Sequence, residues 1–223
     1  MNPSPTPALP VETFPALEEL RGVRHCFTGR VPDLDVKVDR DSALALLDGH
    51  HEAARRNLGL GDRPLIIGKQ VHGADVAVVD AATSVPVPGV DGLITASKDV
   101  CLGVYVADCC AVYLVESERG VIALLHSGRK GSELGITKVA IERMVSEFQC
   151  DPRRMIVQLS PCIRPPHYEV DFAAMIVADC RAAGVGKVVD CGTSTAAHLD
   201  RYYSYRVELG KTGRMLALLA LTA

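Results

Sequence analysis

Apolar positions along the chain switch between a spacing of two residues and a spacing of about 3.6, which predicts strands alternating with helices. Residues 42–58 carry Leu44, Leu47 and Leu58 at helical spacing, and residues 131–148 and 171–183 predict two further helices. Strands are predicted at residues 65–71, 75–79, 91–95, 101–107, 111–116, 121–125 and 155–159. No GxGxxG motif follows a predicted strand, so the pattern favours an α/β or α+β sandwich, with a mixed β-sheet flanked by helices, over a parallel Rossmann sheet.

The N-terminal 15 residues differ in composition from the rest of the chain. Residues 1–15 contain five prolines and few apolar side chains, which predicts a flexible Pro-rich arm. Residues 16–223 contain no Gly/Ser-rich or Pro-rich linker, no internal repeat and no low-complexity tract. We therefore expect a single domain over residues 16–223.

The composition is typical of a globular protein and disfavours nucleic-acid-binding and membrane-spanning classes. The 223 residues are 48% hydrophobic and 23% charged, and a chain of this length buries roughly 70% of its unfolded surface without disulfides. The net charge is −3 and no long run of Lys and Arg occurs, which argues against a nucleic-acid partner. The longest apolar run near an end, residues 215–221, is far shorter than the roughly 20 residues of a membrane span.

The number and spacing of the cysteines indicate whether the protein is expected in a reducing or an oxidising compartment. The eight cysteines form no CxxC pair or compact repeat, and the N-terminal residues lack the basic and apolar regions of a signal peptide. A reduced, cytoplasmic location is the expectation, with cysteines free for packing, metal binding or nucleophilic work.

Three residues capable of metal binding stand at the ends of predicted strands. They are His72, Cys109 and His126, separated by 37 and 17 residues. Two imidazoles and a thiolate form a sound catalytic zinc set that leaves a fourth position open. These separations match no zinc-finger spacing, so packed, hydrogen-bonded roles for the three side chains remain open.

Seven motifs, in order, resemble the YfiH-like, laccase-domain family. They are KQVHGADV (69–76), DGLIT (91–95), VADC (106–109), ALLHSGRKG (123–131), LSPCIRPPHYEV (159–170), YYSYR (202–206) and TGR (212–214). The family was formerly described as multicopper polyphenol oxidase and later as zinc-dependent purine nucleoside phosphorylase. The resemblance places its metal-binding and catalytic residues on His72, Cys109 and His126, with Zn²⁺ as cofactor.

The resemblance also implies a fold and activities. The implied fold is the α/β, cysteine-hydrolase-type fold of the cytotoxic-necrotising-factor deamidase toxins, which use a Cys-His pair. The implied activities are phosphorolysis of adenosine, inosine and methylthioadenosine, and adenosine deamination. A bacterial branch of the family is linked to editing of peptidoglycan precursors.

The sequence departs from the family around the third metal residue. The family motif HAGWRG reads HSGRKG here, so Arg129 replaces the Trp and Lys130 replaces the Arg. The family's Asn-Arg pair in the first helix corresponds to His50 and His51. The metal residues are retained while the substrate-contacting positions differ, which leaves the purine specificity open.

The leading hypothesis is a zinc-dependent purine nucleoside phosphorylase or adenosine deaminase that acts on a small-molecule nucleoside and phosphate. Arg129, Lys130 and Arg206 are candidates for binding phosphate, with surface ion pairing as the alternative role. Tyr203 and Tyr205 are candidates for stacking on a base, with packing as the alternative. A cation at Arg129 must meet an anionic substrate or pair with an acidic side chain such as Glu133.

Two other functions remain open. In a metal-free hydrolase or amidase, Cys109 would be the nucleophile and His126 or His72 its base. In a catalytically inactive binding homologue, the altered HSGRKG segment would have removed activity. Copper oxidation is disfavoured because it needs several clustered histidines and the chain has only seven. The sequence sets no oligomeric state.

Overall fold

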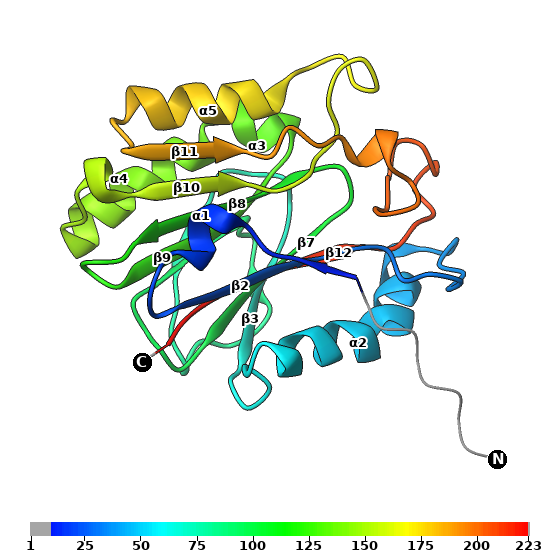
Figure 1. Ribbon diagram of the computed structural model, residues 1–223, viewed down its shortest axis with the longest axis horizontal. Helices are drawn as coiled ribbons and strands as arrows, with labels where there is room; N and C mark the ends of the chain where they lie inside the picture. Colours follow the sequence, from blue (N-terminus) through cyan, green and yellow to red (C-terminus); the bar gives the residue numbers. More distant parts are fainter. Residues whose placement is uncertain (1–9, 223) are drawn as a thin grey trace.

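The apolar strands assemble into two six-stranded sheets in the computed structural model, which describes residues 10–222 (Figure 1). The first sheet has the order β1 (Val11–Glu12), β2 (Val23–Thr28), β12 (Met215–Leu221), β7 (Cys101–Val106), β3 (Leu65–Lys69) and β5 (Val87–Pro88). The second has the order β11 (Lys187–Asp190), β10 (Ile156–Leu159), β8 (Cys110–Glu116), β9 (Val121–Ser127), β6 (Gly92–Thr95) and β4 (Val76–Val78).

Both sheets are mixed. Strand β3 runs parallel to β5 and β7, and the pairs β10–β11 and β4–β6 are also parallel, whereas the remaining pairs are antiparallel. The predicted mixed-sheet sandwich is therefore confirmed.

The main core lies between the sheets. Leu102 and Val104 of β7 pack there with Tyr113 and Val115 of β8, because alternate residues of a strand point to the same face. Strand β12 is buried on both faces: alternate residues enter this core, and the others enter a smaller cluster on the outer side of the first sheet. Burial on both faces explains why residues 215–221 form a continuous apolar run.

Five α-helices of the described residues surround the sheets. They are α1 (Pro15–Glu18), α2 (Arg40–Asn57), α3 (Arg129–Glu133), α4 (Ile136–Phe148) and α5 (Phe172–Ala182), with short 3₁₀ turns at Pro152–Arg154 and Thr195–Ala197. Helices α4 and α5 cover the outer face of the second sheet, where Met144 and Ile176 join a core with Leu114 and Leu125 (Figure 1). No helix among residues 10–222 is both long and apolar enough to cross a membrane.

The helix predicted at residues 131–148 is two helices in the structure. Gly135 lies between α3 and α4 with φ 74°, a left-handed conformation that favours glycine. A continuous helix cannot pass through this residue, so the apolar stripe restarts at Ile136. The helix predicted at residues 42–58 begins two residues earlier, where the Asp39 carboxylate accepts from the Asp41 and Ser42 N–H groups.

The predicted flexible arm at residues 1–15 needs a correction. Residues 1–9 of it lie outside the described part of the chain. From residue 10 onward the prediction is wrong, because β1 pairs with β2 and Phe14 is only 5% exposed. The prolines do not prevent this packing: Pro10 precedes an edge strand, and Pro15 stands at the start of α1, where its missing N–H costs nothing.

Candidate metal centre

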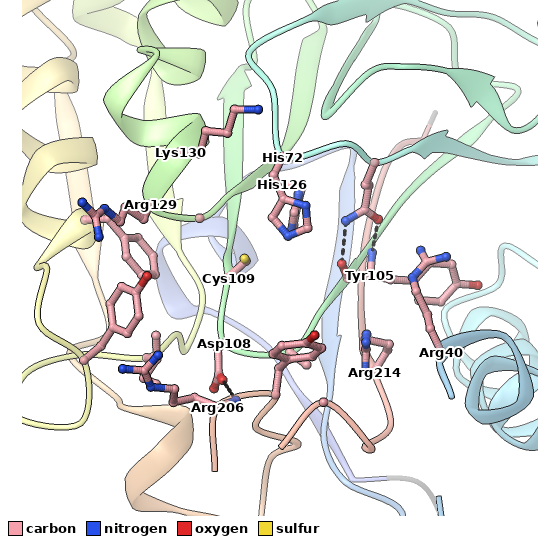
Figure 2. A pocket seen from close by; sticks show the side chains of 18 of the residues that line it. Arg40, His72, Tyr105, Asp108, Cys109, His126, Arg129, Lys130, Arg206 and Arg214 are labelled. Carbon is pink, nitrogen blue, oxygen red and sulfur yellow. Dashed lines mark hydrogen bonds between the residues drawn. The ribbon is translucent and has the colours of Figure 1, made fainter. Parts of the chain in front are cut away.

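His72, Cys109 and His126 lie together at one end of the sandwich (Figure 2). Their ligand atoms are all within 4.8 Å of one another, and the two imidazole rings meet edge-on with centroids 4.7 Å apart. His72 follows β3, Cys109 lies in the turn between β7 and β8, and His126 is near the end of β9. Both sheets therefore contribute strand ends to one site.

Asp91 connects two of these three residues. Its buried carboxylate accepts the backbone N–H groups of Val71, His72 and Gly73 at 2.7–3.1 Å. It also accepts from His126 Nδ1 at 2.7 Å. This bond places the proton of neutral His126 on Nδ1 and leaves Nε2 with a free lone pair, the arrangement common in metal-binding histidines.

The backbone is strained beside two of the three side chains. His72 and Asp108 adopt left-handed conformations, with φ 60° and 83° respectively. The contacts of Asp91 hold the first of these turns. The carboxylate of Asp108 holds the second, since it accepts from Thr195 Oγ1, Ser204 Oγ and the Arg206 N–H at 2.7–3.0 Å. Strain held by buried hydrogen bonds is typical of a functional site.

The charges at the site favour a thiolate. Burial opposes ionisation of Cys109, but the neighbouring His126 and His72 outweigh it and hold the pKa of the thiol below its usual range. Burial likewise opposes protonation of His126, while Cys109 and Asp91 raise the pKa of its imidazole. The thiolate is the form of cysteine that binds metals and acts as a nucleophile.

Gly128 allows the thiol to occupy this position. A Cβ atom added to Gly128 would lie 2.6 Å from Cys109 Sγ and 3.9 Å from His72 Cδ2. Real Cβ atoms do not approach a sulfur this closely, so a side chain here would displace the thiol. The close approach gives a physical reason for glycine in the HSGRKG segment.

The three side chains open into a cavity of about 1280 Å³. Its apolar wall includes Ile163, Tyr168 and Phe172, and several cationic side chains also line it. The combination of an apolar wall with a few converging polar groups is typical of a small-molecule site.

Two of the three predicted phosphate-binding cations have acidic partners. Arg129 contacts Glu133 at 2.8 Å and Glu169 at 3.7 Å, and Arg206 contacts Glu169 at 3.3 Å. The expected pairing of Arg129 with an acidic side chain is therefore present. Lys130 also lines the cavity and makes no ion pair with any residue from 10 to 222.

The two tyrosines considered for base stacking have different positions. Tyr203 is fully buried, and its hydroxyl accepts the Val31 N–H, so packing is its role. Tyr205 lines the cavity, is 55% exposed, and lies 5.7 Å from the guanidinium carbon of Arg214.

Sequence reasoning missed Asp91 and Gly128, and it did not single out Arg40 and Arg214, which also line the cavity. Asp91 and Arg214 occur in the motifs DGLIT and TGR, yet no feature of these segments indicates which distant groups they meet. Asp91 alone offered a sequence signal, because it directly precedes an apolar strand. A carboxylate buried at such a place requires hydrogen-bond donors.

The donor set fits a transition-metal ion. Two imidazoles and one thiolate, with a carboxylate orienting one imidazole, match the three-ligand set of catalytic metal sites. Within residues 10–222, this is the one cluster of His, Cys, Asp and Glu with metal-site geometry. Fold and site thus define an α+β sandwich protein with a His–Cys–His cluster that could hold a metal ion.

The chain belongs to the family described as multi-copper polyphenol oxidoreductase laccase, which matches residues 33–176 and 170–222. This assignment confirms the resemblance to the laccase-domain family. The family description names copper, whereas the described residues supply a single three-residue cluster.

Several curated relatives carry enzyme names. A purine nucleoside phosphorylase of Streptomyces coelicolor is 36% identical over 160 residues, which are 68% of this chain and 66% of the relative. A purine nucleoside phosphorylase of Deinococcus radiodurans is 32% identical over 68% of both chains. An adenosine deaminase from an unknown prokaryotic organism is 33% identical over 47% of this chain and 42% of the relative. Alignments to two further phosphorylases span 52% and 54% of those proteins.

Solved structures show the same fold. YfiH of Bacillus licheniformis superposes with a TM-score of 0.83 over 97% of both chains at 17% sequence identity. YlmD of Geobacillus stearothermophilus superposes with a TM-score of 0.79 over 92% of this chain and 93% of that chain at 23% identity. The expected YfiH-like fold is therefore confirmed.

Proposed function

We propose that this protein is a zinc-dependent enzyme that acts on purine nucleosides, by phosphorolysis of adenosine, inosine or methylthioadenosine or by deamination of adenosine. The observation that carries the proposal is the His72–Cys109–His126 cluster at the wall of a cavity with ample room for a nucleoside. The names of the relatives support the substrate class.

In this proposal, His72, Cys109 and His126 hold Zn²⁺ and are the catalytic centre. Zinc held by these residues would supply Lewis-acid chemistry. Asp91 would keep the Nδ1 proton on neutral His126 and leave the lone pair of Nε2 free for a metal ion. The apolar side chains of Ile163 and Phe172 would exclude water from one side of a bound purine.

Phosphorolysis also requires the cavity to bind inorganic phosphate next to the sugar of the nucleoside. A phosphate oxygen forms a bond to the sugar C1′ as the bond from C1′ to the purine nitrogen breaks, and the departing purine takes up a proton. Lys130, Arg129 and Arg206 would attract the anionic phosphate into the cavity. Lys130 would contribute most, because Glu133 and Glu169 offset the charge of the two arginines.

The test combines metal analysis with product analysis. Protein purified without added metal should contain about one zinc per chain, and Cys109→Ala should lose it. With phosphate, inosine should yield hypoxanthine and ribose 1-phosphate, whereas adenosine without phosphate should yield inosine and ammonia if deamination occurs. A zinc-loaded protein that converts none of these nucleosides would contradict the proposed activity.

The contacts of Cys109 favour a second function, that of a metal-free cysteine hydrolase. The Cys109 thiol, the His126 imidazole and the Asp91 carboxylate match the nucleophile, base and orienting carboxylate of cysteine hydrolases. Such an enzyme would cleave an amide, for example in a peptidoglycan precursor. Absence of zinc together with rapid alkylation of Cys109 would favour this function. Nucleoside binding without turnover would instead indicate an inactive binding homologue.

A further inference from the structure

The four arginines that line the cavity in the described part of the chain form two groups on opposite sides of the candidate metal centre (Figure 2). Arg129 and Arg206 lie on one side and share the carboxylate of Glu169. Arg40 and Arg214 lie on the other side, next to Tyr105. Only the first group has its charge offset by glutamates, Glu133 and Glu169.

Arg214 is a buried cation that no carboxylate of the described residues contacts. It is 8% exposed, and no carboxylate among residues 10–222 lies within 4.0 Å of its guanidinium. Its Nη1 donates to the carbonyls of Thr212 and Gly213, both at 2.8 Å. In the described part of the chain, no protein acceptor meets Nε or Nη2. A buried charge in this state lacks the partner that normally offsets its desolvation.

Arg40 adds a second positive charge close to the first. Burial, and then the charge of Arg40, lower the pKa of Arg214. The acidic group nearest Arg40 is Asp41, 3.7 Å away and almost fully exposed, where solvent screens the pair. Two guanidiniums held together repel each other unless an anion lies between them.

Neighbouring carboxylates are engaged elsewhere. Asp39 lines the cavity, but its oxygens cap α2 by accepting from Asp41 and Ser42. Asp108 also lines the cavity, and both of its oxygens accept hydrogen bonds from the chain segments that it anchors. Asp108 and Cys109 attract Arg214 electrostatically, but burial and the charge of Arg40 outweigh them, so the pKa of Arg214 is lowered. Neither Asp39 nor Asp108 makes a hydrogen bond or ion pair with its guanidinium.

Helix α2 fixes this pair of arginines in the fold. Arg40 is its first residue, and His51 on the same helix donates from Nε2 to the carbonyl of Arg214 at 3.1 Å. The ring of Tyr205 lies 5.7 Å from the Arg214 guanidinium carbon on the cavity side. The guanidinium is thus held in place before any ligand binds, which reduces the entropy lost on binding.

We propose that Arg214 and Arg40 form an oxyanion subsite that binds a phosphoryl group within the cavity of the metal centre. A planar guanidinium donates two parallel hydrogen bonds to a phosphate, and the second arginine completes the charge balance. The phosphoryl group is either free inorganic phosphate or the phosphate of a nucleotide. The assignment of phosphate as a co-substrate rests on the proposed function, whereas the location of the subsite rests on the cavity itself.

Calorimetric titration of the full-length protein with inorganic phosphate tests the subsite directly. Arg214→Gln and Arg40→Gln should each weaken phosphate binding at least tenfold. Arg214→Lys should bind with an intermediate Kd, because lysine keeps the charge and loses the two-pronged contact. Arg56→Gln is the matched control: it removes the same charge from the exposed face of the same helix and should leave the Kd within twofold.

The outcomes separate the subsite from the proposed reaction. Unchanged phosphate binding in both Arg40→Gln and Arg214→Gln, or no binding of phosphate or nucleotide by the wild-type protein, would overturn the subsite. If Arg214→Gln does not fold, Arg40→Gln decides, because Arg40 is half exposed. Arginine-dependent phosphate binding without phosphorolysis would overturn the proposed reaction and leave the subsite standing.

A second titration identifies the source of the phosphoryl group. Inosine and inosine 5′-phosphate are compared with and without saturating inorganic phosphate. If the subsite takes a co-substrate, phosphate and inosine bind together, and the two arginine variants raise KM for phosphate more than KM for inosine. If it takes a nucleotide, phosphate competes with inosine 5′-phosphate, and the variants weaken the nucleotide more than the nucleoside. Equal effects on nucleoside and nucleotide, with no change for phosphate, would contradict the proposal.

Discussion

At the scale of single residues, Asp91 has the widest set of contacts at the metal centre. One buried carboxylate sets the backbone turn of His72 and the proton position on His126. Such partners of metal-binding histidines restrict both the orientation of the ring and its protonation state. The geometry of the centre therefore depends on a residue that is not itself a ligand.

We predict that Asp91→Asn lowers zinc affinity about 10-fold to 100-fold. Asparagine keeps the size and one acceptor oxygen, but it removes the charge that orients His126. Competition with a chromogenic chelator measures the affinity. Asp99→Asn, at an exposed position, serves as the control. Equal zinc affinity in wild type and Asp91→Asn would show that the carboxylate does not organise the centre.

Gly128 gives a second prediction at this scale. Gly128→Ala should weaken metal binding at least about tenfold, because the new methyl group would meet Cys109 Sγ at 2.6 Å and displace it. Metal content after dialysis is the measurement. Gly49→Ala is the control, since it meets nothing within 4 Å and should raise helix stability by up to about 1 kcal/mol. Full metal occupancy in Gly128→Ala would refute the prediction.

At the scale of elements, the N-terminal segment packs more tightly than its composition suggests. Phe14 packs against His25 and Tyr113, with ring centroids 5.7 and 5.4 Å away, and its N–H donates to His25 Nε2. Strand β1 and helix α1 therefore extend the first sheet and cover part of the core. Their local sequence alone gives a weak signal, because a two-residue strand has no periodicity.

Phe14→Ala should destabilise the protein by about 3 kcal/mol, as is usual when a buried aromatic side chain is removed. Urea unfolding measures the change. Val11→Ala, at a position that is 42% exposed in the same segment, should cost less than about 1 kcal/mol. Similar stability of Phe14→Ala and wild type would mean that the segment does not contribute to the core.

At the scale of the whole molecule, two buried histidines couple stability to pH. Burial lowers the pKa of both His25 and His51 to about 4, although each retains a hydrogen bond. Unfolding returns them to an ordinary value of about 6.5. Above pH 6.5 both states are neutral. As pH falls from about 6.5 to about 4, the unfolded state binds more protons, so the free energy of unfolding decreases.

The expected loss is about 2 kcal/mol for each histidine between pH 7.5 and pH 5.0. Urea unfolding at these two values measures the total change. His25→Gln can still accept the Phe14 N–H, and it should reduce the pH-dependent loss by about 2 kcal/mol. An identical pH dependence in wild type and His25→Gln would contradict the role of His25.

Local patterns in the sequence determined most of the secondary structure and the three metal-binding candidates. Hydrophobic periodicity is local, so α2, α4, α5 and most strands could be predicted within a few residues. His72, Cys109 and His126 were visible because they follow or end apolar strands and stand in ordered motifs.

Tertiary structure alone decided the division into two sheets, the partners of the three residues and the charge balance of the cavity. Asp91 meets His126 across 35 residues, and the carbonyl of Arg214 meets His51 across 163. Contacts over such separations leave no periodic trace, because each depends on where the sheets place chain segments far apart in sequence. For the same reason, the ion pair of Arg129 could be expected from the sequence, since Glu133 is one helical turn away. The burial of Arg214 without a contacting carboxylate is visible only in the folded cavity.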